Sequence, residues 1–134
     1  PELAGEPGFA EAAATLDLIE GLDIRLVIPG HGAPFADAAG ALARARSRLA
    51  YLSADPVRNA ENAVKVMLKF LLLERRQLPL SDVAALFAAI PLLELARVRY
   101  FDRSAVELAE WAMQALVRSG AARREGTLLV DAGV

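Results

Sequence analysis

The chain's only histidine lies in the segment best suited to chemistry, Pro-Gly-His-Gly at residues 29–32. Pro29 fixes the backbone φ angle, while Gly30 and Gly32 permit positive φ angles and close approach by other groups. An imidazole held on such a loop, here His31, could ligate a metal ion while an outer partner holds its second ring nitrogen. A tight turn whose histidine only hydrogen-bonds to backbone is the alternative, and the four residues alone do not separate the two readings.

Residue counts limit this chemistry. The chain of 134 residues contains one histidine and no cysteine, which excludes disulfides, cysteine-zinc sites and thiol nucleophiles. A zinc hydrolase site needs about three or more protein ligands, mostly His with Asp or Glu, and His31 alone cannot supply them. We therefore expect no complete metal site in this chain, and no catalytic residue is identified.

The elements that would position His31 are a helix, a strand and a second helix. Apolar residues at helical spacing predict a helix over residues 9–20. Residues 24–28 are β-branched or aliphatic except for Arg25, which predicts a buried strand, parallel to its neighbours because it follows a helix. His31 would then lie at the carboxyl end of a strand, where α/β proteins often place functional groups. An alanine- and arginine-rich helix is predicted over residues 37–53.

The following part of the chain is predicted to hold a long and a short helix. Asp55 and Pro56 start the long one, with Asp as N-cap and Pro at the first helical position, and it runs to about residue 76. The short helix covers residues 81–89, after the break at Pro79. The apolar stripe expected along the long helix consists of Val64, Met67, Leu68, Leu71 and Leu72.

A further helix and a hairpin are predicted at the end of the chain. Ser104, with Glu107 three residues later, has the spacing of a capping box. Residues 121–124 and 127–130 flank Glu125-Gly126, which is expected to form a two-residue turn. The residues expected to be buried on this helix are Val106, Ala109, Trp111, Met113, Leu116 and Val117. The fold class expected is therefore mostly α with a small β-hairpin (α+β), and its element order is that of a winged helix.

The stretch around His31 resembles the end of a known enzyme fold. Residues 16–34, a helix followed by Asp-Ile-Arg-Leu-Val-Ile-Pro-Gly-His-Gly, resemble the last helix and strand of the metallo-β-lactamase fold. Residues 41–130 look like the helical connection and winged-helix appendage that follow this loop in one branch of these hydrolases. The resemblance implies three parts: a C-terminal remnant of an αββα metallo-β-lactamase domain at 1–36, a connecting helix at 37–56, and a winged-helix-like domain at 57–134. It also implies that His31 is a metal ligand, most often to zinc.

The rest of the superfamily's metal site is missing from this chain. Its His-x-His-x-Asp-His loop, its middle histidine and its bridging aspartate have no counterpart here. We expect them to precede Pro1 in a longer parent, so zinc would be bound by the parent hydrolase and not by this chain alone. The expected partner is therefore the N-terminal metallo-β-lactamase domain. Self-association as a homodimer, or partial disorder of the first 35 or so residues, is expected in its absence.

A non-enzymatic winged-helix module for protein interaction or regulation is the alternative function. Nucleic-acid binding is not expected, because the predicted third helix carries Glu107 and Glu110 with only Arg118. Residues 97–124 contain six arginines against three acidic residues, which we interpret as ordinary solvated charges. The net charge of −2, the lack of a long apolar run and the lack of a signal-peptide pattern predict a cytoplasmic protein with no membrane contact.

Overall fold

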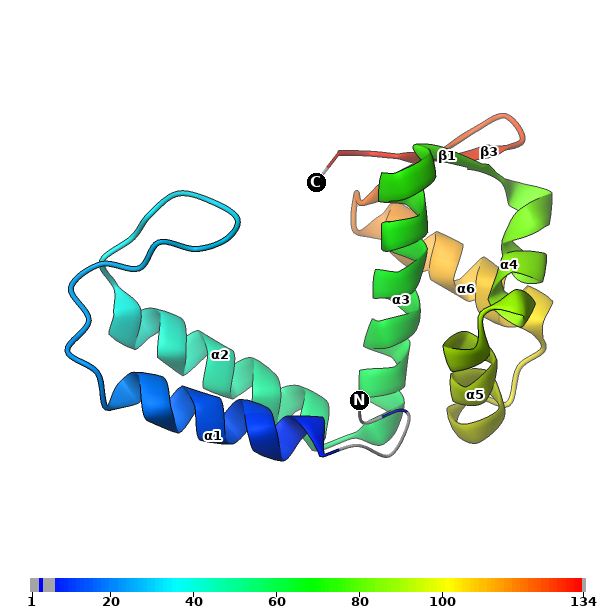
Figure 1. Ribbon diagram of the computed structural model, residues 1–134. Coiled ribbons are helices and arrows are strands. Elements are labelled where there is room, and N and C mark those ends of the chain that lie inside the picture. Colours follow the sequence, from blue (N-terminus) through cyan, green and yellow to red (C-terminus); the bar gives the residue numbers. More distant parts are fainter. Residues whose placement is uncertain (1–2, 4–6, 134) are drawn as a thin grey trace. The chain divides into compact units, whose positions relative to one another are not determined.

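The computed structural model describes residue 3 and residues 7–133 of the chain. These divide into two compact units, Pro1–Asp55 (unit 1) and Pro56–Val134 (unit 2). The chain is mostly helical, with one small antiparallel sheet in unit 2 (Figure 1), which confirms the predicted α+β class. None of the helices over residues 7–133 combines the length and apolar character needed to cross a membrane.

Unit 1 is built on two neighbouring helices, α1 (Gly8–Glu20) and α2 (Ala38–Ser53) (Figure 1). The Asp37 side chain caps α2 by accepting a hydrogen bond of 2.8 Å from the backbone N–H of Gly40. Leu16 and Ile19 of the predicted apolar face of α1 are only partly buried. Neither helix contains a fully buried residue, so this pair has no core of its own.

The buried parallel strand expected at residues 24–28 is not present. Val27 alone forms an antiparallel bridge, with Phe35, through N–H···O bonds of 2.8 and 3.0 Å. The side chains on either side of it are open to solvent, Leu26 being 57% and Ile28 75% exposed. A parallel strand needs neighbouring strands to pair with and layers to cover both faces, and the part of unit 1 that the structure describes supplies neither.

The helices of unit 2 follow the predicted order, with one addition. They are α3 (Pro56–Arg75), a 3₁₀ turn η2 (Leu80–Asp82), α4 (Val83–Ala89), α5 (Pro91–Tyr100) and α6 (Ala105–Arg118). On α3, Val64, Leu68 and Leu72 follow one another by one turn and are fully buried, which confirms the centre of the predicted stripe. The helix α5 was not predicted. Its Pro91 occupies the first turn, where a missing N–H leaves no hydrogen bond unmade.

The helix α6 begins with the predicted capping box. The Ser104 hydroxyl accepts from the Glu107 N–H at 3.2 Å, and the Glu107 carboxylate accepts from the Ser104 N–H at 2.7 Å. The face of α6 that packs inward consists of Leu108, Ala109, Ala112, Met113 and Leu116. The prediction that Val106 and Val117 are buried is wrong, since both are exposed. At 3.6 residues per turn they lie roughly a quarter turn or more from the centre of that face.

The sheet of unit 2 has three short strands in the order β1-β3-β2, namely β1 (Gln77–Pro79), β2 (Ala122–Glu125) and β3 (Leu128–Asp131). The predicted hairpin is present, but its turn lies one residue later than expected. Glu125 pairs with Leu128, so Gly126 and Thr127 form the turn, and Gly126 takes the positive φ of 60° that such turns require. The strand β1 was not predicted.

One hydrophobic core holds the elements of unit 2 together. Leu78 of β1 and Leu129 of β3 are paired across the sheet and both are buried, so the sheet presents one apolar face to the helices. The fully buried cluster consists of Val64, Leu68, Leu72, Leu78, Val83, Phe87, Leu93, Leu108, Ala109, Ala112, Met113, Leu116, Ala122 and Leu129. Unit 2 thus has a continuous buried core, whereas the α1–α2 pair has no buried residue.

An ion pair with little exposure joins α3 to the end of the sheet. The Lys69 ammonium donates to the Asp131 carboxylate and, at 2.7 Å, to the Ala121 carbonyl. The two side chains are 14% and 4% exposed. The hydrogen bond from Lys69 holds the pKa of Asp131 below its ordinary value, against the opposing effect of burial. Lys69 interrupts an apolar stretch of the sequence because it is the partner of this carboxylate.

Candidate functional site

The loop that carries His31 is closed by the bridge between Val27 and Phe35. The two hydrogen bonds of that bridge hold the ends of residues 28–34 together, and the His31 side chain between them is exposed. Gly32 has a φ of +96°, which favours glycine, whereas the φ of Gly30 lies in the range that other residues adopt. A Cβ at either position would meet no atom within 4 Å. The loop is therefore open around both glycines.

The donor set around His31 does not amount to a metal site. Over residues 7–133 no three side chains of His, Cys, Asp or Glu are gathered so that they could hold a metal ion. A structural or catalytic zinc ion requires at least about three protein ligands. The structure thus leaves His31 as a single exposed imidazole, and a complete zinc site would need donors from outside the described residues.

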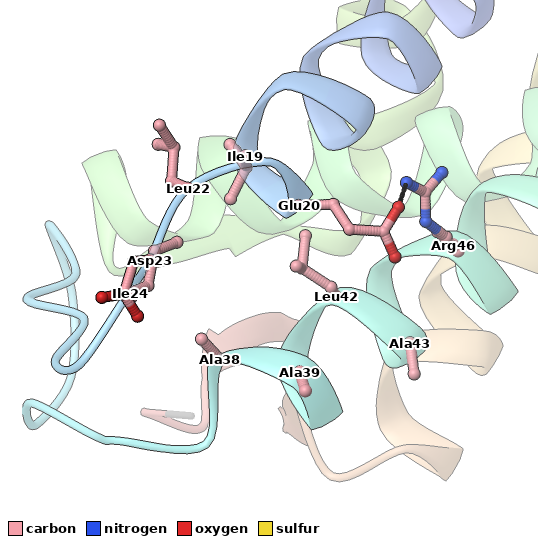
Figure 2. A pocket seen from close by; sticks show the side chains of 10 residues that line it. All are labelled: Ile19, Glu20, Leu22, Asp23, Ile24, Ala38, Ala39, Leu42, Ala43 and Arg46. Atoms are coloured by element: carbon pink, nitrogen blue, oxygen red, sulfur yellow. Dashed lines mark hydrogen bonds and ion pairs between the residues drawn. The ribbon is translucent and has the colours of Figure 1, made fainter.

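An apolar pocket of about 400 Å³ lies within unit 1, between the carboxyl end of α1 and the amino half of α2 (Figure 2). Ile19 and Leu22 line it from the α1 side and Leu42 from α2. Ile24, in the segment that leads toward the His31 loop, completes the apolar wall. Short helices in water are held mainly by packing, and neither α1 nor α2 has a buried residue, so this wall leaves apolar surface open to solvent.

The charged edge of this pocket holds α1 and α2 together. Arg46 donates to Asp17 at 2.8 Å and to Glu20 at 2.7 Å, and Figure 2 marks the second of these contacts. The hydrogen bond to Asp17 is the main reason that the pKa of Arg46 is raised, with Glu20 adding to it. The guanidinium therefore serves to join the two helices, and we assign it no role in chemistry.

The basic residues near the hairpin are paired with carboxylates. Arg124 donates to Glu110 of α6 at 2.7 Å, and Arg123 contacts Glu125 within β2. A phosphate-binding surface needs cations whose charge is not already neutralised. The positive charge at the hairpin is thus largely offset by Glu110 and Glu125.

A second surface hollow lies along α6, at the site of Trp111. The ring of Trp111 packs at 6.2 Å from that of Phe101 and carries the Arg103 guanidinium at 5.5 Å from its centre. Trp111 is partly buried against the core of unit 2, as expected from its spacing. Sequence reasoning missed that one side of this ring borders a hollow, because helical periodicity gives a residue's angle on its helix but not the path of the loop before it.

No protein-family model, curated protein or solved structure matches this chain.

Proposed function

We propose that the chain is the C-terminal part of a metal-dependent hydrolase, most simply a zinc enzyme of the metallo-β-lactamase superfamily. In this proposal His31 supplies one metal ligand through a ring nitrogen. The remaining ligands come from a metallo-β-lactamase domain outside the described residues. The chain by itself is inactive, and no catalytic step is assigned to its residues.

The observation that carries the proposal is the presentation of His31. Its loop is closed at the base by the bridge of Val27 with Phe35, and its side chain is exposed. Beside it, Leu26 and Ile28 expose apolar surface that a neighbouring layer would cover. A ligand loop next to an uncovered apolar segment is the arrangement expected if both meet the same missing partner.

Unit 2 supports the second half of the proposal, a winged-helix-like appendage. A first helix, α3, is followed by the short strand β1, by further helices and by the β2–β3 hairpin. The strand β1 pairs with β3 of the hairpin, which brings the strand between the first two helices beside the wing, as in a winged helix. We propose that this unit borders the substrate cleft or a subunit contact of the parent enzyme.

The reading frame that encodes Pro1 provides the first test. We expect it to extend upstream and to encode a His-x-His-x-Asp-His loop. A frame without that loop would refute the proposal and would leave the alternative, a non-enzymatic winged-helix module for protein interaction or regulation.

The protein encoded by the extended frame provides the second test. We expect it to bind zinc and to hydrolyse a member of a panel of esters, thioesters, lactams and phosphodiesters. His31→Ala should lower both the zinc content and the activity, whereas Ala33→Ser, a change at an exposed position of the same loop, should lower neither. Full zinc content and activity in His31→Ala would show that His31 is not a ligand.

A further inference from the structure

The outer side of α6 bears a shallow groove of about 580 Å³, formed entirely within unit 2. Its apolar part comes from Val106, whose side chain is 67% exposed, and from one side of Trp111. Three carboxylates line it as well, those of Asp102, Glu107 and Glu110. An exposed valine next to an indole, in a hollow edged by charge, has the composition of a surface that meets another molecule.

The charged residues that line this groove indicate which kind of ligand it would bind. Arg103 is the one cation among the lining residues, and Arg124 offsets part of the Glu110 charge from the neighbouring strand. With Arg124 counted, the groove keeps a small excess of negative charge, which favours cations over phosphate groups. A phosphate backbone fits this face poorly, although the corresponding helix of a winged-helix protein often contacts DNA.

The carboxylates of Glu107 and Glu110 stay ionised and keep acceptor capacity. The pKa of Glu107 is lowered chiefly by the backbone hydrogen bond from Ser104, and that of Glu110 chiefly by Arg124. Each of these contacts uses one carboxylate oxygen, Oε2 of Glu107 and Oε1 of Glu110. An ionised carboxylate has roughly four acceptor positions, so both can bind an incoming guanidinium or ammonium group.

The indole of Trp111 already contacts a cation of this chain, the guanidinium of Arg103. Arg103 places its guanidinium 5.5 Å from the centre of the Trp111 ring, within the range of a cation–π contact. The carboxylates of Glu107 and Glu110 line the same groove, so an incoming cation would meet them beside the ring face that Arg103 covers. The groove thus combines an aromatic surface and carboxylates, which together suit arginine or lysine side chains flanked by apolar ones.

We propose that this α6 groove binds a basic, amphipathic segment of a partner protein. An apolar side chain of the segment covers Val106, and its cations meet the carboxylates along α6. This interaction is independent of His31 and of any metal, so the proposed hydrolase function can fail while this proposal stands, and the reverse.

Titration of the whole chain with a synthetic amphipathic peptide tests the proposal. The peptide presents leucine and arginine on one helical face, and Trp111, the only tryptophan of the chain, reports binding by its fluorescence. We expect saturable binding that weakens as salt is added, because exposed charge contacts are screened. The same peptide with glutamate for arginine, and a short DNA duplex, should not bind.

Matched substitutions locate the binding. Asp102→Asn and Glu110→Gln should each weaken binding of the arginine peptide by about two- to fivefold, the usual effect of losing an exposed ion pair. Val106→Ser should weaken this binding as well. Glu74→Gln and Val66→Ser, which change the same kinds of group at exposed positions of α3, should leave it unchanged. Circular dichroism shows whether each variant is folded.

Three results would overturn the proposal. They are the absence of saturable binding of the arginine peptide, equal binding of the glutamate peptide, and equal weakening by the α3 controls. Binding of the DNA duplex in preference to the peptide would assign the groove to nucleic acid and would equally refute it.

Discussion

Leu68 is the residue whose truncation best tests the account of unit 2 as a domain with its own core. Its side chain is fully buried at the centre of the α3 stripe, between Val64 and Leu72. Buried leucine-to-alanine changes cost about 2–5 kcal/mol, because apolar contacts are lost and a cavity remains. We take about 3 kcal/mol for Leu68→Ala, a large part of the roughly 4–12 kcal/mol expected for a domain of about 80 residues.

Thermal unfolding of this variant gives the measurement. A loss of about 3 kcal/mol lowers the Tm of a domain of this size by roughly 12–24 °C. The fluorescence of Trp111 follows unit 2 alone, since unit 1 has no tryptophan. Far-UV circular dichroism, recorded in parallel, follows the helices of both units.

Leu73→Ala is the matched control, because it makes the same chemical change on the same helix. The Leu73 side chain is 45% exposed, so its truncation should cost about 1 kcal/mol or less. Equal losses in the two variants, or no loss in Leu68→Ala, would show that the core is not organised around α3 as described.

Three further predictions concern the ion pair, the α6 cap and unit 1. The lowered pKa of Asp131 means that its contribution to stability is present above its ordinary value of 3.8 and is lost as the pH falls through the lower, folded-state pKa. The free energy of unfolding, measured with urea, should therefore fall more steeply in acid for the wild type than for Asp131→Asn. Parallel curves of this free energy against pH would contradict the prediction. Ser104→Ala removes the side-chain half of the capping box and should cost about 1 kcal/mol, seen as a lower urea midpoint, while Ser81→Ala, outside any helix cap, should leave the midpoint nearly unchanged. Backbone amides of α1 and α2 should exchange with deuterium much faster than those of α3 and α6, because neither α1 nor α2 has a buried residue. Equal protection would mean that unit 1 is held by packing not described above.

Local signals in the sequence predicted most helices of unit 2 well. The capping box of Ser104 with Glu107 acts within one turn of backbone, so its effect is nearly independent of the rest of the chain. The helix α3 begins at Pro56, as the proline predicted. The α3 stripe was likewise predictable, because a fully apolar face at helical spacing has few alternatives. What local signals could not give was the exact turn of the hairpin, because moving the turn by one residue changes the sequence pattern little.

Features that depend on distant partners were predicted poorly. The strand β1 has three residues and one of them is proline, so it exists only because β3 lies beside it. The prediction for residues 24–28 fails for the opposite reason. Its β-branched residues favour a strand, but within the described part of the chain only Phe35 pairs with this segment, through Val27. The role of His31 is of the same kind. Its loop was predictable from Pro29 and the glycines, but a metal site is defined by several ligands together, so one loop cannot reveal it.

The order of the strands has a consequence for how the protein is made. The last strand, β3 (Leu128–Asp131), lies between β1 and β2 and contributes Leu129 to the core. During synthesis from the amino end, α3, α4, α5 and α6 leave the ribosome before the strand that joins them to a sheet, and β1 has no partner until then. The unit can therefore complete its fold only after residue 131 has emerged. A ribosome that stalls even a few codons earlier would release a chain with an open core, a natural substrate for chaperones and proteases.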